Sequence, residues 1–148
     1  MRAELRARRD RCVERHDAAL SRTPTRVGGD FERELRIVVE ELTAVAREAD
    51  DPASDPVEVA KTYRWLGDAF FDLGHGTDDS LLVRGVQAYE RAEALLASAE
   101  VPVEKAKLDF NFGNTLRGLS HGEDVALLEA AQTHYESAQR AFRANRLS

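Results

Sequence analysis

A stretch of 41 residues, 56–96, occurs twice in this chain, and this repetition constrains the possible fold more than any other feature of the sequence. Moving the stretch 46 positions forward places it on residues 102–142 without a gap, and 15 of the 41 positions are identical. The identities include a proline, a glycine, a histidine and a tyrosine: Pro56/Pro102, Gly67/Gly113, His75/His121 and Tyr89/Tyr135. A fixed period in the tens of residues is typical of proteins built from stacked repeats.

Each copy has the pattern of two helices. Asp55 and Pro56 begin the first helix, because aspartate caps a helix N-terminus and proline fits its first position. We expect Glu58 to complete a capping box there. Gly74-His75-Gly76 ends this helix, because glycine accepts the left-handed conformation there, and Asp78 or Asp79 begins the next. The second copy carries the corresponding signals: Pro102, His121-Gly122 and Asp124. We expect one face of each helix to be buried, with Phe142 on the inward face of the last helix.

The first 50 residues contain two further amphipathic patterns, over 2–20 and from an expected N-cap at Asp30, joined by a loop at 21–29. They align only weakly with the repeat, since the signature glycine is replaced by Ser21. We therefore interpret residues 1–50 as a degenerate first unit, because the terminal units of repeat proteins often depart from the pattern. The prediction is a single all-α domain, 1–148, of three stacked antiparallel hairpins with units 1–50, 51–97 and 98–148.

Composition narrows the functional classes. The chain has a net charge of −6, which disfavours nucleic acid as the partner of the whole surface. Cys12 is the only cysteine, so no intrachain disulfide and no cysteine-based metal cage is possible. No apolar run approaches the ~20 residues of a membrane span. The basic N-terminus lacks the apolar segment of a secretory signal. We expect a cytoplasmic protein that does not enter the membrane.

No motif in the sequence predicts catalysis. It contains no glycine-rich phosphate loop, no His-Glu-x-x-His and no nucleophile elbow. Cys12 and His16 could form a thiolate pair, but the same spacing describes an ordinary helical stripe. His75 and His121 are explained as helix-end residues rather than as metal ligands, since histidine favours the negative end of a helix. We expect a protein that is not an enzyme and has no metal or cofactor.

Within each unit, the first helix carries a large residue before a glycine, as in Leu66-Gly67 and Phe112-Gly113, and the second carries Tyr89 with Ala92 or Tyr135 with Ala138. This pattern resembles the tetratricopeptide repeat family, in particular its long-period bacterial forms, although the period is 46 rather than the usual 34. The resemblance implies a right-handed α-solenoid. It also places the small alanine of the second helix against the glycine, with the aromatic residue wedged between units.

The resemblance further implies a binding scaffold, in which the first helix of each unit lines a concave groove for a peptide or protein segment. The residues at groove-facing positions are Lys61, Arg64, Trp65, Asp68 and Phe71 in the second unit and Lys107, Phe110, Asn111, Asn114 and Arg117 in the third. Trp65 has two possible roles, as a packed aromatic side chain or as an anchor for the partner.

Two alternatives to a peptide-binding adaptor remain open from the sequence. The N-terminal segment contains six closely spaced arginines, which could bind nucleic acid or an acidic surface, or could balance acidic neighbours such as Glu32, Glu34 and Glu40. These arginines are Arg2, Arg6, Arg8, Arg9, Arg11 and Arg15. The open end of a helical stack could also bury its apolar face on a second copy of the chain, giving a homo-oligomer.

Overall fold

The structure is a computed structural model that describes residues 1–21 and 29–147. These residues form six helices and no strand: α1 (Ala3–Ser21), α2 (Gly29–Ala49), α3 (Pro56–Gly74), α4 (Asp79–Leu96), α5 (Pro102–Ser120) and α6 (Val125–Leu147). The predicted all-α class is therefore confirmed. The predicted loop at 21–29 falls largely on residues 22–28, which lie outside the described part of the chain.

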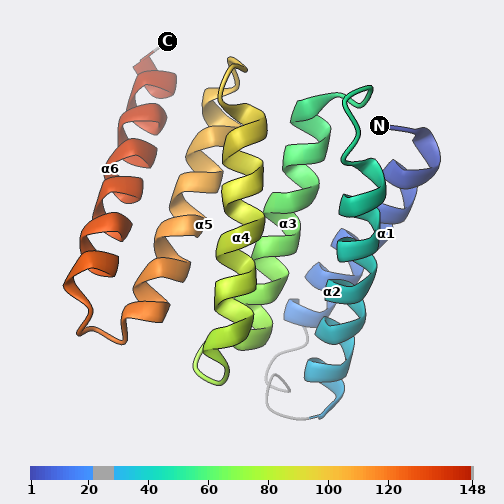
Figure 1. The fold of residues 1–148 in the computed structure, drawn as a ribbon, viewed down its shortest axis with the longest axis horizontal. Helices are drawn as coiled ribbons and strands as arrows, with labels where there is room; N and C mark the ends of the chain where they lie inside the picture. The colour runs from blue at the N-terminus through green and yellow to red at the C-terminus, as the bar shows by residue number, and fades with distance from the viewer. Residues whose placement is uncertain (22–28, 148) are drawn as a thin grey trace.

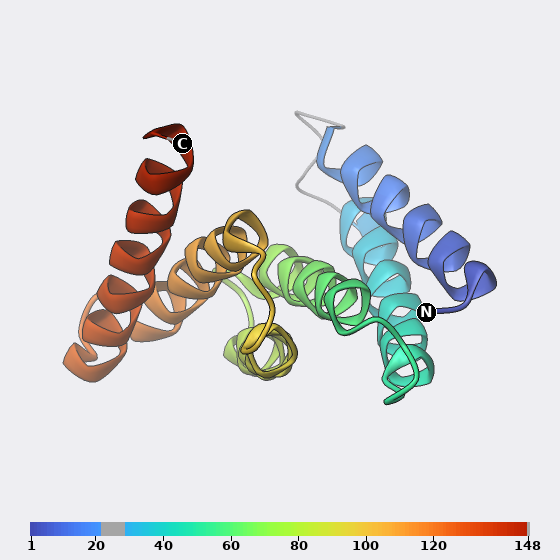
Figure 2. The same cartoon turned by 90° about the horizontal axis from the view of Figure 1, so that it is seen from above.

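Consecutive helices run in opposite directions and pack against each other (Figure 1). Contacts join α1 with α2, α3 with α4 and α5 with α6, and each pair meets the next through α2 with α3 and α4 with α5. The odd-numbered helices are also neighbours, since α1 contacts α3 and α3 contacts α5. Seen from above, the row of helices is bent, and α1 and the C-terminal end of α6 both rise on the side of α3 that faces away from α4 (Figure 2).

The core follows the predicted amphipathic faces. One cluster of buried side chains joins α2, α3 and α4, and it includes Val38, Leu42, Leu66 and Phe70. A second cluster joins α4, α5 and α6 and includes Tyr89, Phe112 and Ala131. The expectation that Phe142 is buried was wrong, because its side chain is 37% exposed. Phe142 lies near the end of the last helix, where no following hairpin covers it among the described residues.

The helix signals in the repeat are largely confirmed. Asp55 accepts a hydrogen bond from the Val57 amide at 2.9 Å, and Asp78 accepts one from the Ser80 amide at 2.9 Å. The glycines after α3 and α5 are left-handed, with φ of 79° at Gly76 and 74° at Gly122. Glycine adopts this conformation without the steric cost that other residues carry.

Two expected N-terminal signals differ in the structure. Glu58 does not complete a capping box, because its carboxylate forms ion pairs with Arg6, Arg9 and Lys61 instead. Asp30 is not an N-cap, since α2 already begins at Gly29 and Asp30 lies within its first turn. There it faces Arg33 at 3.4 Å. The local sequence did not predict this outcome. The ion pairs of Glu58 with three cations outweigh a single hydrogen bond to a backbone amide.

The signature glycines make room for tyrosine rings, and this corrects the expected packing of alanine against glycine. A Cβ atom on Gly67 would lie 2.5–2.8 Å from atoms of the Tyr89 ring, and one on Gly113 would lie 2.8–3.1 Å from the Tyr135 ring. The small residue that faces Gly67 is Gly85, where an added Cβ would lie 3.3 Å from the Gly67 carbonyl oxygen. The Tyr89 ring also stacks on Phe112 of α5, with ring centroids 5.6 Å apart, so it joins consecutive hairpins.

Replacing Gly67 with alanine is expected to destabilise the protein. The new methyl group would overlap the Tyr89 ring, which is 1% exposed and has little room to move. Overpacking of this kind costs about 1–3 kcal/mol, and the better helix propensity of alanine offsets only part of it, at most ~1 kcal/mol. Urea denaturation of Gly67→Ala should therefore show a lower free energy of unfolding than wild type.

Gly29→Ala is the matched control. It lies in the first turn of α2, and the nearest atom to an added Cβ is the end of the flexible Arg33 side chain at 4.0 Å. Its stability should equal or slightly exceed that of the wild type. A Gly67→Ala variant as stable as Gly29→Ala would disprove the close packing of tyrosine on glycine.

Candidate functional site

Helices α3 and α5 enclose a hollow whose floor lies on α4. It has a volume of about 250 Å³ and is lined by polar and aromatic side chains: Asp68, Phe71, Asp72, Tyr89, Asn111 and Asn114. Four of these were predicted from the family resemblance as groove residues: Asp68, Phe71, Asn111 and Asn114. The structure thus brings four of the ten predicted groove residues together in this one hollow.

Asp68 is the centre of the polar network in this hollow. Its Oδ1 atom accepts hydrogen bonds from the Tyr89 hydroxyl at 2.7 Å and from the Asn111 amide at 2.9 Å. Its Oδ2 atom lies 3.3 Å from the Arg64 guanidinium. Burial raises the pKa of Asp68, while Arg64 and the Tyr89 hydroxyl oppose this shift. The carboxylate is therefore held in place by three donors from three helices.

Asp72 connects the hollow to α1. Its Oδ2 atom lies 2.6 Å from Nε2 of His16, whose side chain is buried. Cys12, one turn before His16, is also buried, and burial raises the pKa of its thiol, with a further contribution from Glu41. The imidazole of His16 thus contacts a carboxylate, and the environment of Cys12 favours the protonated thiol, which is a poor nucleophile.

Three other predicted groove residues of α3 are engaged within the chain. Arg64 is only 8% exposed, and its guanidinium binds Glu104 of α5 at 3.1 Å as well as Asp68. Trp65 is half-buried, and the guanidinium carbons of Arg9 and Arg64 lie 4.9 and 5.1 Å from its ring centroid. Lys61 pairs with Glu58 at 3.3 Å. Arg64 and Trp65 therefore stabilise the packing of α1, α3 and α5.

The remaining predicted residues of α5 are the most accessible. Lys107 and Arg117 are exposed, and Phe110 is 50% exposed while its ring lies 5.9 Å from that of Tyr135. Asn114 accepts a hydrogen bond from the Tyr135 hydroxyl at 2.6 Å. This bond reproduces, 46 residues on, the bond from Tyr89 to Asp68. Helix α5 thus presents an exposed aromatic side chain, Phe110, while Asn114 lines the hollow.

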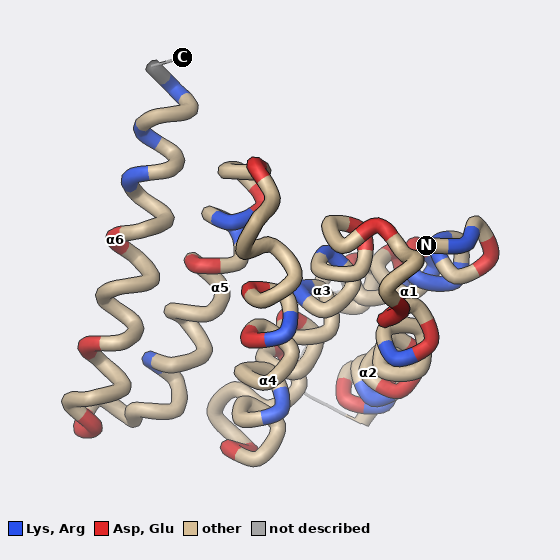
Figure 3. Tube along the Cα trace, turned by 45° about the horizontal axis from the view of Figure 1, so that its top comes forward, with Lys and Arg blue, Asp and Glu red and all other residues tan. Residues whose placement is uncertain are grey.

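The N-terminal arginines face acidic side chains of the same chain. Five of the six form ion pairs: Arg2 with Glu48, Arg6 with Glu58, Arg8 with Glu41 and Glu48, Arg9 with Asp10 and Glu58, and Arg15 with Glu34. Figure 3 shows basic and acidic residues interspersed along α1 and α2. The interpretation that this cluster balances acidic neighbours therefore has structural support, although among the described residues only Glu34 of the expected neighbours is paired with it and Glu32 pairs with Arg36 instead.

The helix-end histidines make different local contacts. His75 stacks on Phe71, with ring centroids 4.7 Å apart. Nε2 of His121 lies 2.7 Å from Oδ2 of Asp79 at the start of α4. Hydrogen bonding to Asp79, with a smaller contribution from Glu123, raises the pKa of His121. Neither histidine belongs to a group of three potential metal ligands among the described residues.

Two features of the site were missed by sequence reasoning. Tyr89 and Asp72 line the hollow, although Tyr89 was expected only as the aromatic residue wedged between units. Asp72 lies one turn after Asp68, and this spacing was the one available signal. A group of three potential metal ligands joins α4, α5 and α6 and has no counterpart in the predicted sites: Glu93, Asp109 and His134.

Replacing Tyr89 with phenylalanine is expected to lower the free energy of unfolding by about 1.5–3 kcal/mol, because a buried carboxylate loses a donor. Tyr135→Phe is the matched control, since its hydroxyl binds the neutral amide of Asn114 in a more exposed setting. That variant should lose only about 0.5–1.5 kcal/mol. Chemical denaturation of both variants measures the difference, and equal losses would contradict the central role of Asp68.

The His121–Asp79 pair gives a prediction about pH. The pKa of His121 should lie above its ordinary value near 6.5 and should fall towards that value in Asp79→Asn. Glu123→Gln should lower it less, because Glu123 is the weaker contributor. Because the pKa is raised on folding, the stabilisation is complete below the unfolded pKa and is lost as the pH rises through the folded pKa. NMR titration of the imidazole resonances measures both shifts, and an unchanged pKa in Asp79→Asn would disprove the pairing.

Comparison of the chain with models of known protein families, with curated proteins and with solved structures gave no match. None of the described helices is both long enough and apolar enough to cross a lipid bilayer.

Proposed function

We propose that this protein is a non-catalytic scaffold that binds a peptide or protein segment along the face formed by α1, α3 and α5. In this proposal the three helix pairs are tetratricopeptide-like units, and the odd-numbered helices are the first helices of each unit. The contacts of α1 with α3 and of α3 with α5 support this assignment, because neighbouring first helices meet in such a stack.

The observation that carries the proposal is the hollow between α3 and α5. Its lining comes from two successive units, and four of its six residues occupy positions that the family resemblance assigns to the groove. Phe71 supplies an apolar surface, while Asn111 and Asn114 supply side-chain amides. Amide groups match the donors and acceptors of a peptide backbone, since both carry an N–H and a C=O.

The state of the polar groups supports binding rather than catalysis. The Asp68 carboxylate already accepts bonds from Tyr89, Asn111 and Arg64, and Asp72 is paired with His16. A general base needs a lone pair within hydrogen-bond reach of a substrate proton. The Asp68 oxygens are instead committed to fixing the walls of the hollow, which favours a preformed recognition surface.

Peptide binding is tested by selecting ligands from a random peptide library on the purified protein. Selected peptides are then titrated into wild type, Asn114→Ala and Phe110→Ser by calorimetry. Both variants should weaken binding about five- to thirtyfold, because a lost hydrogen bond and a lost aromatic contact each contribute ~1–2 kcal/mol at an interface. Trp65, the only tryptophan, provides a fluorescence signal for the same titration.

Val83→Ser is the matched control for Phe110→Ser. Val83 is 45% exposed on α4, outside the proposed binding face of α1, α3 and α5, whereas Phe110 lies on α5. The peptides should bind this variant with wild-type affinity. If no peptide is selected, or if Val83→Ser weakens binding as much as Phe110→Ser, the proposed recognition face is wrong.

A further inference from the structure

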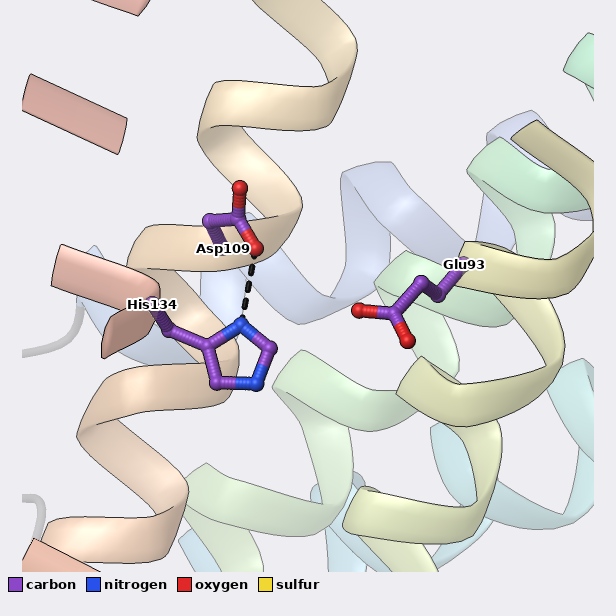
Figure 4. Close-up of side chains that lie close together, drawn as sticks. All are labelled: Glu93, Asp109 and His134. Atoms are coloured by element: carbon purple, nitrogen blue, oxygen red, sulfur yellow. Dashed lines mark hydrogen bonds and ion pairs between the residues drawn. The ribbon is translucent and has the colours of Figure 1, made fainter. Parts of the chain in front are cut away.

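A histidine and two carboxylates converge between α4, α5 and α6, away from the hollow described above. Glu93, Asp109 and His134 each place one potential ligand atom so that all three lie within 4.8 Å of one another. Figure 4 shows the three side chains reaching toward one another from separate helices. Glu93 and Asp109 also line a recess of about 280 Å³.

The positions 46 residues earlier in the chain hold a different set of side chains. Moving Glu93, Asp109 and His134 back by 46 positions gives Arg47, Tyr63 and Ala88. All three line a recess of about 160 Å³ between α2, α3 and α4. The first junction between units therefore carries a cation, a phenol and a methyl group, whereas the second carries three metal-ligating side chains in the same place.

The imidazole is held in a defined orientation at the second junction. Nδ1 of His134 lies 2.7 Å from Oδ1 of Asp109, and both side chains are mostly buried. The His134 ring also stacks on Phe112, with centroids 4.2 Å apart and planes inclined by 19°. The pair therefore brings a ring nitrogen and a carboxylate oxygen, both potential metal ligands, to hydrogen-bond distance of each other.

We propose that Glu93, Asp109 and His134 form a binding site for a divalent transition-metal ion such as Zn²⁺. One imidazole nitrogen and two carboxylate oxygens are donors that Zn²⁺ accepts, whereas Mg²⁺ prefers oxygen ligands alone. Ligands at ~2.0–2.2 Å from a tetrahedral ion lie about 3.3–3.5 Å apart. Nδ1 of His134 and Oδ1 of Asp109 already lie 2.7 Å apart, so closing the cluster to that spacing requires movement of the exposed Glu93 side chain. The ion would join three helices from two consecutive units.

The test is calorimetric titration of Zn²⁺, and separately of Mg²⁺, into tag-free protein at neutral pH. Wild type should bind one Zn²⁺ ion and show weaker affinity for Mg²⁺. Glu93→Gln and His134→Gln should each weaken Zn²⁺ binding at least about tenfold, as expected when one ligand is removed. Glu93→Gln keeps the test decisive even if His134→Gln unfolds, since Glu93 is exposed.

His121→Gln is the matched control. His121 forms a pair with Asp79 at the same 2.7 Å distance, but no third ligand completes that pair among the described residues. Zn²⁺ affinity should be unchanged in this variant. The proposal is overturned if wild type does not bind Zn²⁺, if Glu93→Gln binds it as tightly as wild type, or if His121→Gln weakens binding as much as His134→Gln.

Discussion

The contact of a tyrosine ring with a glycine backbone is the constraint on which the second and third helix pairs depend. Tyr89 lies on Gly67 and Tyr135 lies on Gly113, and each position leaves no room for a Cβ atom. The ring fills the space between the two helices of a pair, so the glycine sets how closely those helices approach. The positions 46 residues before Gly67 and Tyr89 hold Ser21 and Thr43, so neither the glycine nor the tyrosine of this contact occurs there.

The same tyrosines connect the core to the candidate recognition surface. Tyr89 is 1% exposed, yet its hydroxyl donates to Asp68 in the wall of the hollow. The Tyr135 hydroxyl likewise donates a hydrogen bond to Asn114, 46 positions after Asp68. Because Asn111 of α5 also donates to Asp68 of α3, the orientation of the wall residues is fixed across two units. Packing inside each helix pair therefore determines the shape of the surface between pairs, which is what a preformed binding site requires.

The helices and their ends could be predicted from the sequence because they depend on local signals. Asp55, Asp78 and Gly76 act through atoms a few residues away, and the chain repeats these signals at a constant interval. The surroundings of Arg64 could not be predicted in this way. Its position on the helix indicates a groove-facing residue, but Glu104, 40 positions away, draws the guanidinium into a buried ion pair. Long-range partners of charged side chains are set by tertiary packing, which helical periodicity does not encode.

The cluster at the second junction eluded sequence analysis for a related reason. Repetition highlights positions that stay the same, such as His75 and His121, whereas Glu93, Asp109 and His134 are positions at which the two copies differ. In a repeat protein, conserved positions maintain the packing that every unit shares, and a property specific to one junction must arise where the copies diverge. Chemistry specific to one junction is therefore expected at the non-identical positions of the recess between two helix pairs. The neighbouring recess shows what the shared fold requires at those positions.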